Sequence, residues 1–67
     1  KSGFPDIFIF CANKNGNGLA IELKVKPNKP TDNQKEWITQ LWNRNYRAEV
    51  CFSFEEAKSV IDKYLGK

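Results

Sequence analysis

The chain has 67 residues and a formal net charge of +3 at pH 7, with two cysteines and no histidine. A chain of this length makes at most one small domain, and its cysteine and histidine content excludes both a disulfide framework and a Cys/His zinc site. The mild basic excess is compatible with a polyanionic partner, although it is also a common way to stay soluble. No apolar stretch approaches membrane-spanning length, and we expect a cytoplasmic protein with reduced thiols and no membrane partner.

The first half of the chain predicts a β-hairpin. Residues 6–12 are an apolar run typical of a strand, and Pro5 is tolerated at its head. Residues 13–18 contain two Asn-Gly pairs, which favour a turn because they readily adopt positive φ. A second strand, antiparallel to the first, is predicted over residues 19–25, before a loop with two prolines.

The second half predicts a helix, a strand and a second helix. Thr31 and Gln34 form a capping-box pattern that opens the first helix. Its apolar stripe is Trp37, Ile38, Leu41 and Trp42. A strand over residues 46–52 and a helix between Ser53 and Gly66 follow. The helix crossover favours parallel pairing of the second and third strands, so the predicted fold is an α/β mixed sheet in the order β-β-α-β-α.

The second strand carries charged residues where apolar ones are expected. Glu22 and Lys24 are two residues apart and therefore share one face of this strand. Charged groups on an apolar strand cost free energy unless they have partners or a chemical role. If the first strand adds Asp6, the result is two carboxylates and one ammonium, a set that suits a hard cation such as Mg²⁺. We prefer metal-dependent phosphodiester cleavage to the alternative of a solvated, charged sheet face.

Gln34 has two interpretations of equal weight. In one, it is only the third residue of the capping box and reaches back to the Thr31 amide. In the other, it turns toward the face of Glu22 and Lys24, where its amide binds a phosphate or a metal-bound water. The sequence does not decide between them.

The remaining aromatic and basic residues are assigned by their spacing. Trp37, Trp42, Tyr46 and the five phenylalanines are more simply explained as core than as base-stacking platforms, because their spacing is that of buried helix and strand positions. Some basic residues are candidates for phosphate contacts, with a solvated surface as the default: Lys26, Lys29, Lys35, Arg44 and Arg47.

Four blocks, taken together and in order, resemble the VRR-Nuc (virus-type replication-repair nuclease) domain of the PD-(D/E)xK nuclease superfamily. They are residues 3–7 (GFPDI), 20–24 (AIELK), 31–37 (TDNQKEW) and 45–51 (NYRAEVC). The resemblance implies a restriction-endonuclease-like mixed sheet flanked by helices. It also implies a metal-dependent DNA endonuclease.

The resemblance also implies roles for individual residues. Asp6 and Glu22 become the ligands of Mg²⁺ or Mn²⁺, together with the main-chain carbonyl of Leu23. Lys24 becomes the catalytic lysine, and Gln34 the motif glutamine of the following helix. The expected substrate is branched or junction DNA in replication, recombination or repair of a phage or viral type, in a bacterial or phage-infected cell.

The sequence departs from the family at its start. The family begins with a helix that bears a further acidic residue, and then a strand, and neither is visible here. We therefore expect a single domain over residues 1–67 that lacks these elements. The main alternative is a DNA-binding module that keeps the nuclease fold but does not cleave, and a small interaction domain is a third. The apolar first strand would leave an unpaired sheet edge, so we also expect a homodimer.

Overall fold

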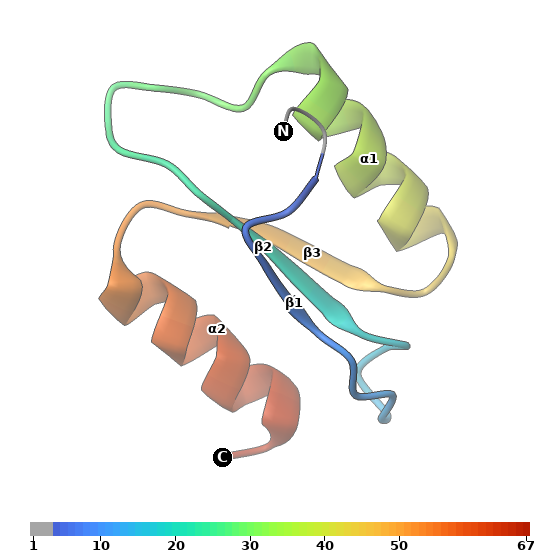
Figure 1. The fold of residues 1–67 in the computed structure, drawn as a ribbon. Helices are drawn as coiled ribbons and strands as arrows, with labels where there is room; N and C mark the ends of the chain where they lie inside the picture. Colours follow the sequence, from blue (N-terminus) through green and yellow to red (C-terminus); the bar gives the residue numbers. More distant parts are fainter. Residues whose placement is uncertain (1–3) are drawn as a thin grey trace.

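The computed structural model describes residues 4–67, and a three-stranded mixed sheet forms its centre (Figure 1). The strands are β1 (Ile7–Ile9), β2 (Leu19–Leu23) and β3 (Arg47–Cys51), in that spatial order. β2 pairs antiparallel with β1 and parallel with β3. The helices α1 (Asp32–Asn43) and α2 (Phe54–Leu65) lie on opposite faces of this sheet. The predicted fold class, element order and strand pairings are confirmed.

The strands are shorter than the sequence predicts. β1 ends at Ile9, which is paired with Leu19, the first residue of β2. The chain then leaves the ladder, and Phe10 is exposed to solvent. β2 ends at Leu23 because its partner β3 ends at the paired residue, Cys51. An apolar run marks where a strand lies, but the length of its partner decides where it stops.

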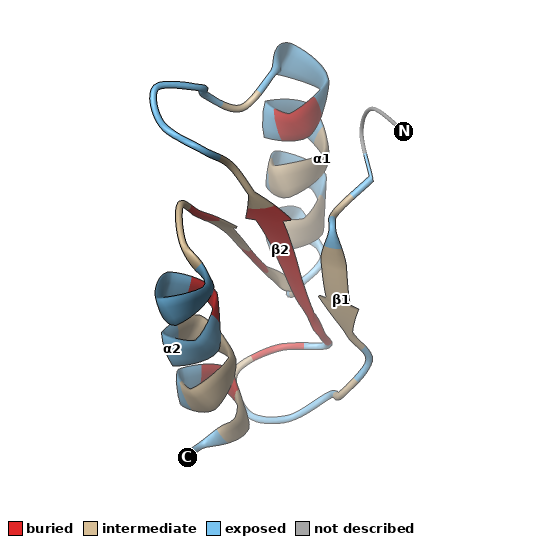
Figure 2. Ribbon diagram, turned by 60° about the vertical axis from the view of Figure 1, so that its left-hand side comes forward, coloured by how far each residue is buried: buried red, intermediate tan, exposed pale blue. Residues whose placement is uncertain are grey.

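The two faces of β2 pack against different helices and carry different kinds of side chain. Leu19 and Ile21 point toward α2, where they form the core with Cys51, Ala57 and Tyr64. Ala20 and Glu22 alternate with these residues and therefore point to the α1 side. The buried colour of β2 in Figure 2 extends through both sets. The central strand is thus buried on both faces, but only the α2 face is purely apolar.

Two expectations about the core are wrong. The apolar stripe of α1 is only partly buried, and the one buried residue of this helix is Gln34. Phe4, Phe10 and Phe54 are exposed rather than core residues. The spacing was right, but these side chains are not covered: in the described part of the chain α1 packs mainly against β3 and reaches β2 through the Gln34 side chain, and Phe54 is the first, exposed residue of α2.

The two cysteines are free thiols, as expected for a reduced protein. Burial of Cys51 raises the pKa of its thiol, and the nearby carboxylates of Glu56 and Glu49 raise it further. The thiol therefore stays protonated and acts as a small apolar core residue.

Tyr64 fastens the end of α2 to the turn between β1 and β2. Its hydroxyl lies 2.6 Å from the Cys11 carbonyl oxygen and 2.9 Å from that of Gly16. The side-chain amides of Asn13 and Asn15 donate to the Tyr64 carbonyl at 2.8 and 2.9 Å. These bonds satisfy a carbonyl that a helix C-terminus leaves without an intrahelical partner. The Asn-rich turn is therefore part of the tertiary structure and not merely a hairpin loop.

Tyr64→Phe should lower the free energy of unfolding by about 1–3 kcal/mol, because it leaves buried carbonyls without their donor. Burial also raises the pKa of the Tyr64 hydroxyl, so the folded chain holds this proton more tightly than the unfolded chain. Stability should then fall as the pH rises above about 10, and Tyr64→Phe should reduce this fall. Urea unfolding at pH 7 and pH 10.5 measures both effects.

Tyr46→Phe is the matched control, because no hydrogen bond of the Tyr46 hydroxyl is found among residues 4–67. Equal stability losses in the two variants would show that the Tyr64 hydroxyl does not fasten the turn.

Candidate active site

Asp6 lies beside Glu22 at the end of the β1–β2 pair. The Asp6 amide donates to the Ile21 carbonyl at 3.0 Å, and Asp6 Oδ2 accepts from the Leu23 amide at 2.8 Å. These two bonds lie on either side of Glu22 along β2. The antiparallel pairing thus brings the two carboxylate-bearing residues together, although fifteen residues separate them in the chain.

Glu22 is the buried acidic group of the site, with only 5% of its surface exposed. Its Oε2 accepts a 2.7 Å hydrogen bond from Gln34 Nε2 and lies 3.6 Å from Lys24 Nζ. Its Oε1 is buried and has no hydrogen-bond partner among the described residues. A buried carboxylate oxygen without a partner is costly, so this atom is the one polar feature of the site that the protein itself leaves unsatisfied.

Lys24 extends the site beyond the last residue of β2. Its amide still donates to the Cys51 carbonyl at 2.9 Å, which holds its backbone in line with the strand. Its side chain is only 17% exposed and reaches back to Glu22. Glu22 and Lys24 therefore meet on one side of the sheet, as their two-residue spacing predicts.

Gln34 closes the capping box and also turns toward Glu22, while the binding of a phosphate or a metal-bound water by its amide stays a prediction. Its Oε1 accepts from the Thr31 amide at 2.9 Å, and the Thr31 hydroxyl accepts from the Gln34 amide at 3.2 Å, which completes the capping box. The amide oxygen is thereby occupied, so Nε2 points to Glu22. The start of α1 orients the carboxylate of β2. The sequence predicts the two orientations as alternatives, whereas in the structure the cap itself fixes the orientation of the amide.

The donor set fits a hard cation. Two carboxylates are present, and Leu23, the residue beside both, bonds to Asp6 through its main chain. All free donors here are oxygens, which suits Mg²⁺ or Mn²⁺ better than a soft metal. Within residues 4–67 no group of three or more His, Cys, Asp or Glu side chains gathers here or elsewhere.

The other candidate lysines lie away from the carboxylates. Lys26 is exposed and lies over the ring of Phe52, with 5.6 Å from Nζ to the ring centroid. Lys29 and Lys35 are exposed in the loop and on α1. Only Lys24 pairs with a carboxylate of the site.

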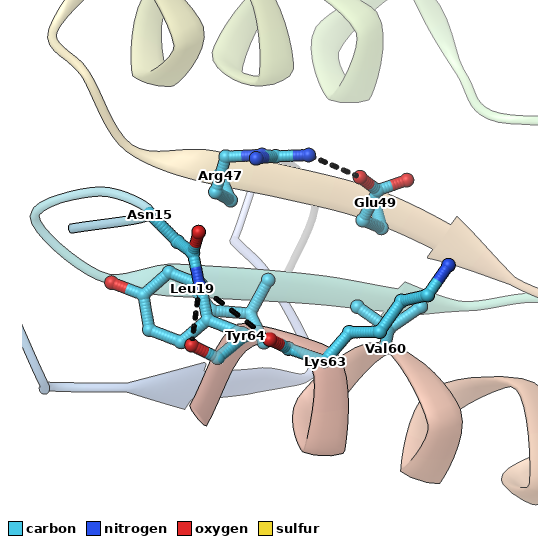
Figure 3. A pocket seen from close by; sticks show the side chains of 7 residues that line it. All are labelled: Asn15, Leu19, Arg47, Glu49, Val60, Lys63 and Tyr64. Carbon is cyan, nitrogen blue, oxygen red and sulfur yellow. Dashed lines mark hydrogen bonds and ion pairs between the residues drawn. The ribbon is translucent and has the colours of Figure 1, made fainter. Parts of the chain in front are cut away.

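A separate cavity of about 430 Å³ lies on the opposite face, between β3 and α2 (Figure 3). Its lining residues are Asn15, Leu19, Arg47, Glu49, Val60, Lys63 and Tyr64. Arg47 and Glu49 pair across its rim, with 4.0 Å between Nη2 and Oε2. Asp6, Glu22, Lys24 and Gln34 are absent from its lining, so it is not part of the carboxylate site, and Arg47, a candidate for phosphate contacts, lies here instead.

The VRR-NUC domain family model matches residues 1–55. The chain belongs to the VRR-NUC domain family. Among solved structures, a VRR_NUC domain protein is similar, with a TM-score of 0.90 and 36% identity. That match covers 98% of this chain and 55% of the other, so this chain spans about half the length of its relative. No curated protein matches the chain.

The VRR-NUC match confirms the resemblance and the nuclease-type fold. It ends within the first turn of α2, so most of this helix lies beyond the matched segment. Neither helix of the described chain is long and apolar enough to cross a membrane.

Gln34→Ala should destabilise the protein more than Thr31→Ala. Both substitutions break the capping box, at a cost of about 0.5–2 kcal/mol. Only Gln34→Ala also removes the donor to buried Glu22, which should cost about 1–3 kcal/mol more. Urea unfolding of the two variants measures the difference. Equal losses would mean that the bond between Gln34 and Glu22 contributes nothing to stability.

Proposed function

We propose that this chain is a divalent-metal-dependent DNA endonuclease domain that hydrolyses phosphodiester bonds. The observation that supports this most strongly is the unsatisfied, buried Oε1 of Glu22, next to Asp6 and to the ammonium of Lys24. A purely structural buried carboxylate would be expected to have both oxygens hydrogen-bonded. Membership of the VRR-NUC family agrees with a nuclease, but the metal dependence rests on this geometry.

The residues proposed to hold Mg²⁺ or Mn²⁺ are Asp6, Glu22 through Oε1, and Leu23 through its main-chain carbonyl. A bound cation of this kind lowers the pKa of a coordinated water and neutralises charge on the scissile phosphate. The chain prepares the two carboxylates in different ways. Asp6 is held by the Leu23 amide, and Glu22 by the Gln34 amide. Neither carboxylate then needs to reorganise when the substrate arrives.

Lys24 is proposed to act on the reacting groups directly. Its ammonium is held near Glu22 by their 3.6 Å contact, and its side chain is largely shielded from solvent. In such an environment a positive charge stabilises negative charge that develops on the phosphate, or orients the attacking water. Gln34, by contrast, acts through Glu22 and is a positioning residue.

The expected substrate is branched or junction DNA, bound mainly through its phosphates. The chain has a net charge of +3, and Lys26, Lys29 and Lys35 are exposed on the loop and helix that follow the site. Phosphate contacts of this kind position DNA without reading its sequence and weaken steeply with salt. The setting in replication, recombination or repair, the cytoplasmic location and the homodimer remain predictions, the last of which light scattering can test.

A DNA-binding module that does not cleave is the second candidate. It is favoured by one observation: residues 4–67 bring two carboxylates to the site and no third acidic side chain. Incubation of a labelled branched DNA with Mg²⁺ separates the two candidates. Nicked product supports the nuclease, and binding without product supports the module.

Asp6→Asn and Glu22→Gln should each lower metal-dependent cleavage by at least about 100-fold. Loss of a residue that only hydrogen-bonds a metal ligand already lowers metal affinity or activity about 10–100-fold, and these two residues are proposed to bind the metal directly. Each replaces an anionic oxygen donor with a neutral group of similar volume. Mg²⁺ should raise the melting temperature of the wild type and not of these variants. Asp62→Asn, a change of the same kind on the far face of α2, is the control. Full activity in excess chelator would overturn the proposed metal chemistry.

Lys24→Ala should lower cleavage by about 10²–10³-fold, the usual cost of losing one group that stabilises transition-state charge. Metal binding, measured by thermal shift, should persist because both carboxylates remain. Because Lys24 also pairs with Glu22, the variant should melt at a lower temperature than the wild type. Lys14→Ala, an exposed lysine in the β1–β2 turn, should change neither property. Activity within tenfold of the wild type would assign Lys24 a structural role.

A further inference from the structure

Three aromatic rings form a continuous strip on the sheet. The ring centroids of Phe8 and Phe10 are 4.4 Å apart, and those of Phe8 and Tyr46 are 6.0 Å apart. We call Phe10, Phe8 and Tyr46 the aromatic strip. Phe10, at its outer end, is 86% exposed, which makes it the most exposed large apolar side chain in the described structure.

The aromatic strip lies on the same face as the carboxylates. Phe8 is paired with Ala20, and Ala20 is two residues before Glu22 on β2. Residues two apart on a strand share a face and are about 6.8 Å apart along it. Phe8 therefore lies about two residues along the sheet from Glu22, and Phe10 lies further from the candidate active site. Among the described residues α1 has no contact with β1, and Phe10 is exposed, so this part of the face is left open.

The sheet is shaped to accommodate this strip. A Cβ atom at Gly18 would lie 3.2 Å from Cδ2 and Cε2 of the Tyr46 ring. The glycine lets Tyr46, which precedes β3, lie across β2 and reach Phe8 on β1. Arg47, the next residue, lies over the Trp42 ring at 4.6 Å, and its guanidinium pairs with Glu49 at the cavity between β3 and α2.

We propose that the aromatic strip stacks unpaired bases of the DNA next to the scissile phosphate, and so selects substrates with a single-stranded segment over continuous duplex. This inference rests on the proposed nuclease function. A phosphate held by the proposed cation at Asp6 and Glu22 would have the neighbouring nucleotides of its strand over this face. Every unpaired base offers a π-face to an exposed ring, whereas the bases of a continuous duplex are already stacked on one another.

The test uses Phe10→Ala and a matched control, Phe54→Ala. Phe54 is 77% exposed at the start of α2, on the other side of the sheet, so the two variants remove the same exposed ring from opposite faces. Fluorescence anisotropy without divalent metal measures binding of a labelled single-stranded oligonucleotide and of a blunt duplex. Phe10→Ala should weaken single-strand binding at least about fivefold and duplex binding less than twofold. Phe54→Ala should change neither.

An oligonucleotide of the same length with several abasic sites tests whether the lost contact is to a base. The wild type should bind it as weakly as Phe10→Ala does, and the substitution should have no further effect on it. A Phe10→Ala loss that is equal on single strand and duplex, or that persists on the abasic strand, would overturn the proposal. So would unchanged single-strand binding.

Two other outcomes are distinguishable. If Phe10→Ala converts a dimer to a monomer in light scattering, a second copy of the chain covers the strip and base stacking is refuted. If the wild type binds neither DNA, with or without Mg²⁺, the nuclease proposal fails together with this one. If it binds both DNAs with no effect of Phe10→Ala, only the stacking proposal fails.

Discussion

The buried carboxylate of Glu22 is the constraint around which the structure is organised. It lies on the central strand, where both faces are covered, and an uncompensated charge there would be severely destabilising. Two groups compensate for it, the Lys24 ammonium just beyond the end of β2 and the Gln34 amide at the start of α1, whereas Asp6 beside it adds a second negative charge. The position of α1 over the end of β2 is thus linked to the charge that it must satisfy.

Only one of the two carboxylate oxygens of Glu22 is compensated in the described chain. Gln34 and Lys24 both act on Oε2, and Oε1 has no partner in the described chain. Glu22 is held in one orientation while one of its oxygens stays available. Such an arrangement sacrifices stability for a preformed electrostatic site, as is common where function requires charge in a low-dielectric environment.

The apolar core and the candidate active site lie on opposite faces of the sheet. The α2 face holds the apolar core of Leu19, Ile21 and Cys51, and the bonds of Tyr64 tie the end of α2 to the turn. The α1 face carries the charges, the capping amide and the exposed aromatic rings. Because alternate residues of one strand serve the two faces, substitutions on the α1 face can alter the site with little effect on the apolar core.

The sequence by itself determined the element order and the strand pairings, because these follow from local patterns and chain connectivity. Apolar periodicity, the Asn-Gly pairs, the capping boxes and the handed crossover each act over a short stretch. It also placed Glu22 and Lys24 on one face, because a strand alternates with a fixed period. Strand ends were less predictable, because they depend on the length of the partner, as at Leu23 and Cys51.

Only the tertiary structure decided what lies opposite each side chain. It placed the Gln34 amide on Glu22, left one carboxylate oxygen without a partner, and exposed Phe10 although its apolar run predicted burial. A residue pattern states which face a side chain takes, but not whether another element covers that face. Whether a face is covered depends on where α1 packs. In the described chain α1 packs against β3 and does not cover β1, and this packing depends on contacts between residues that are distant in the sequence.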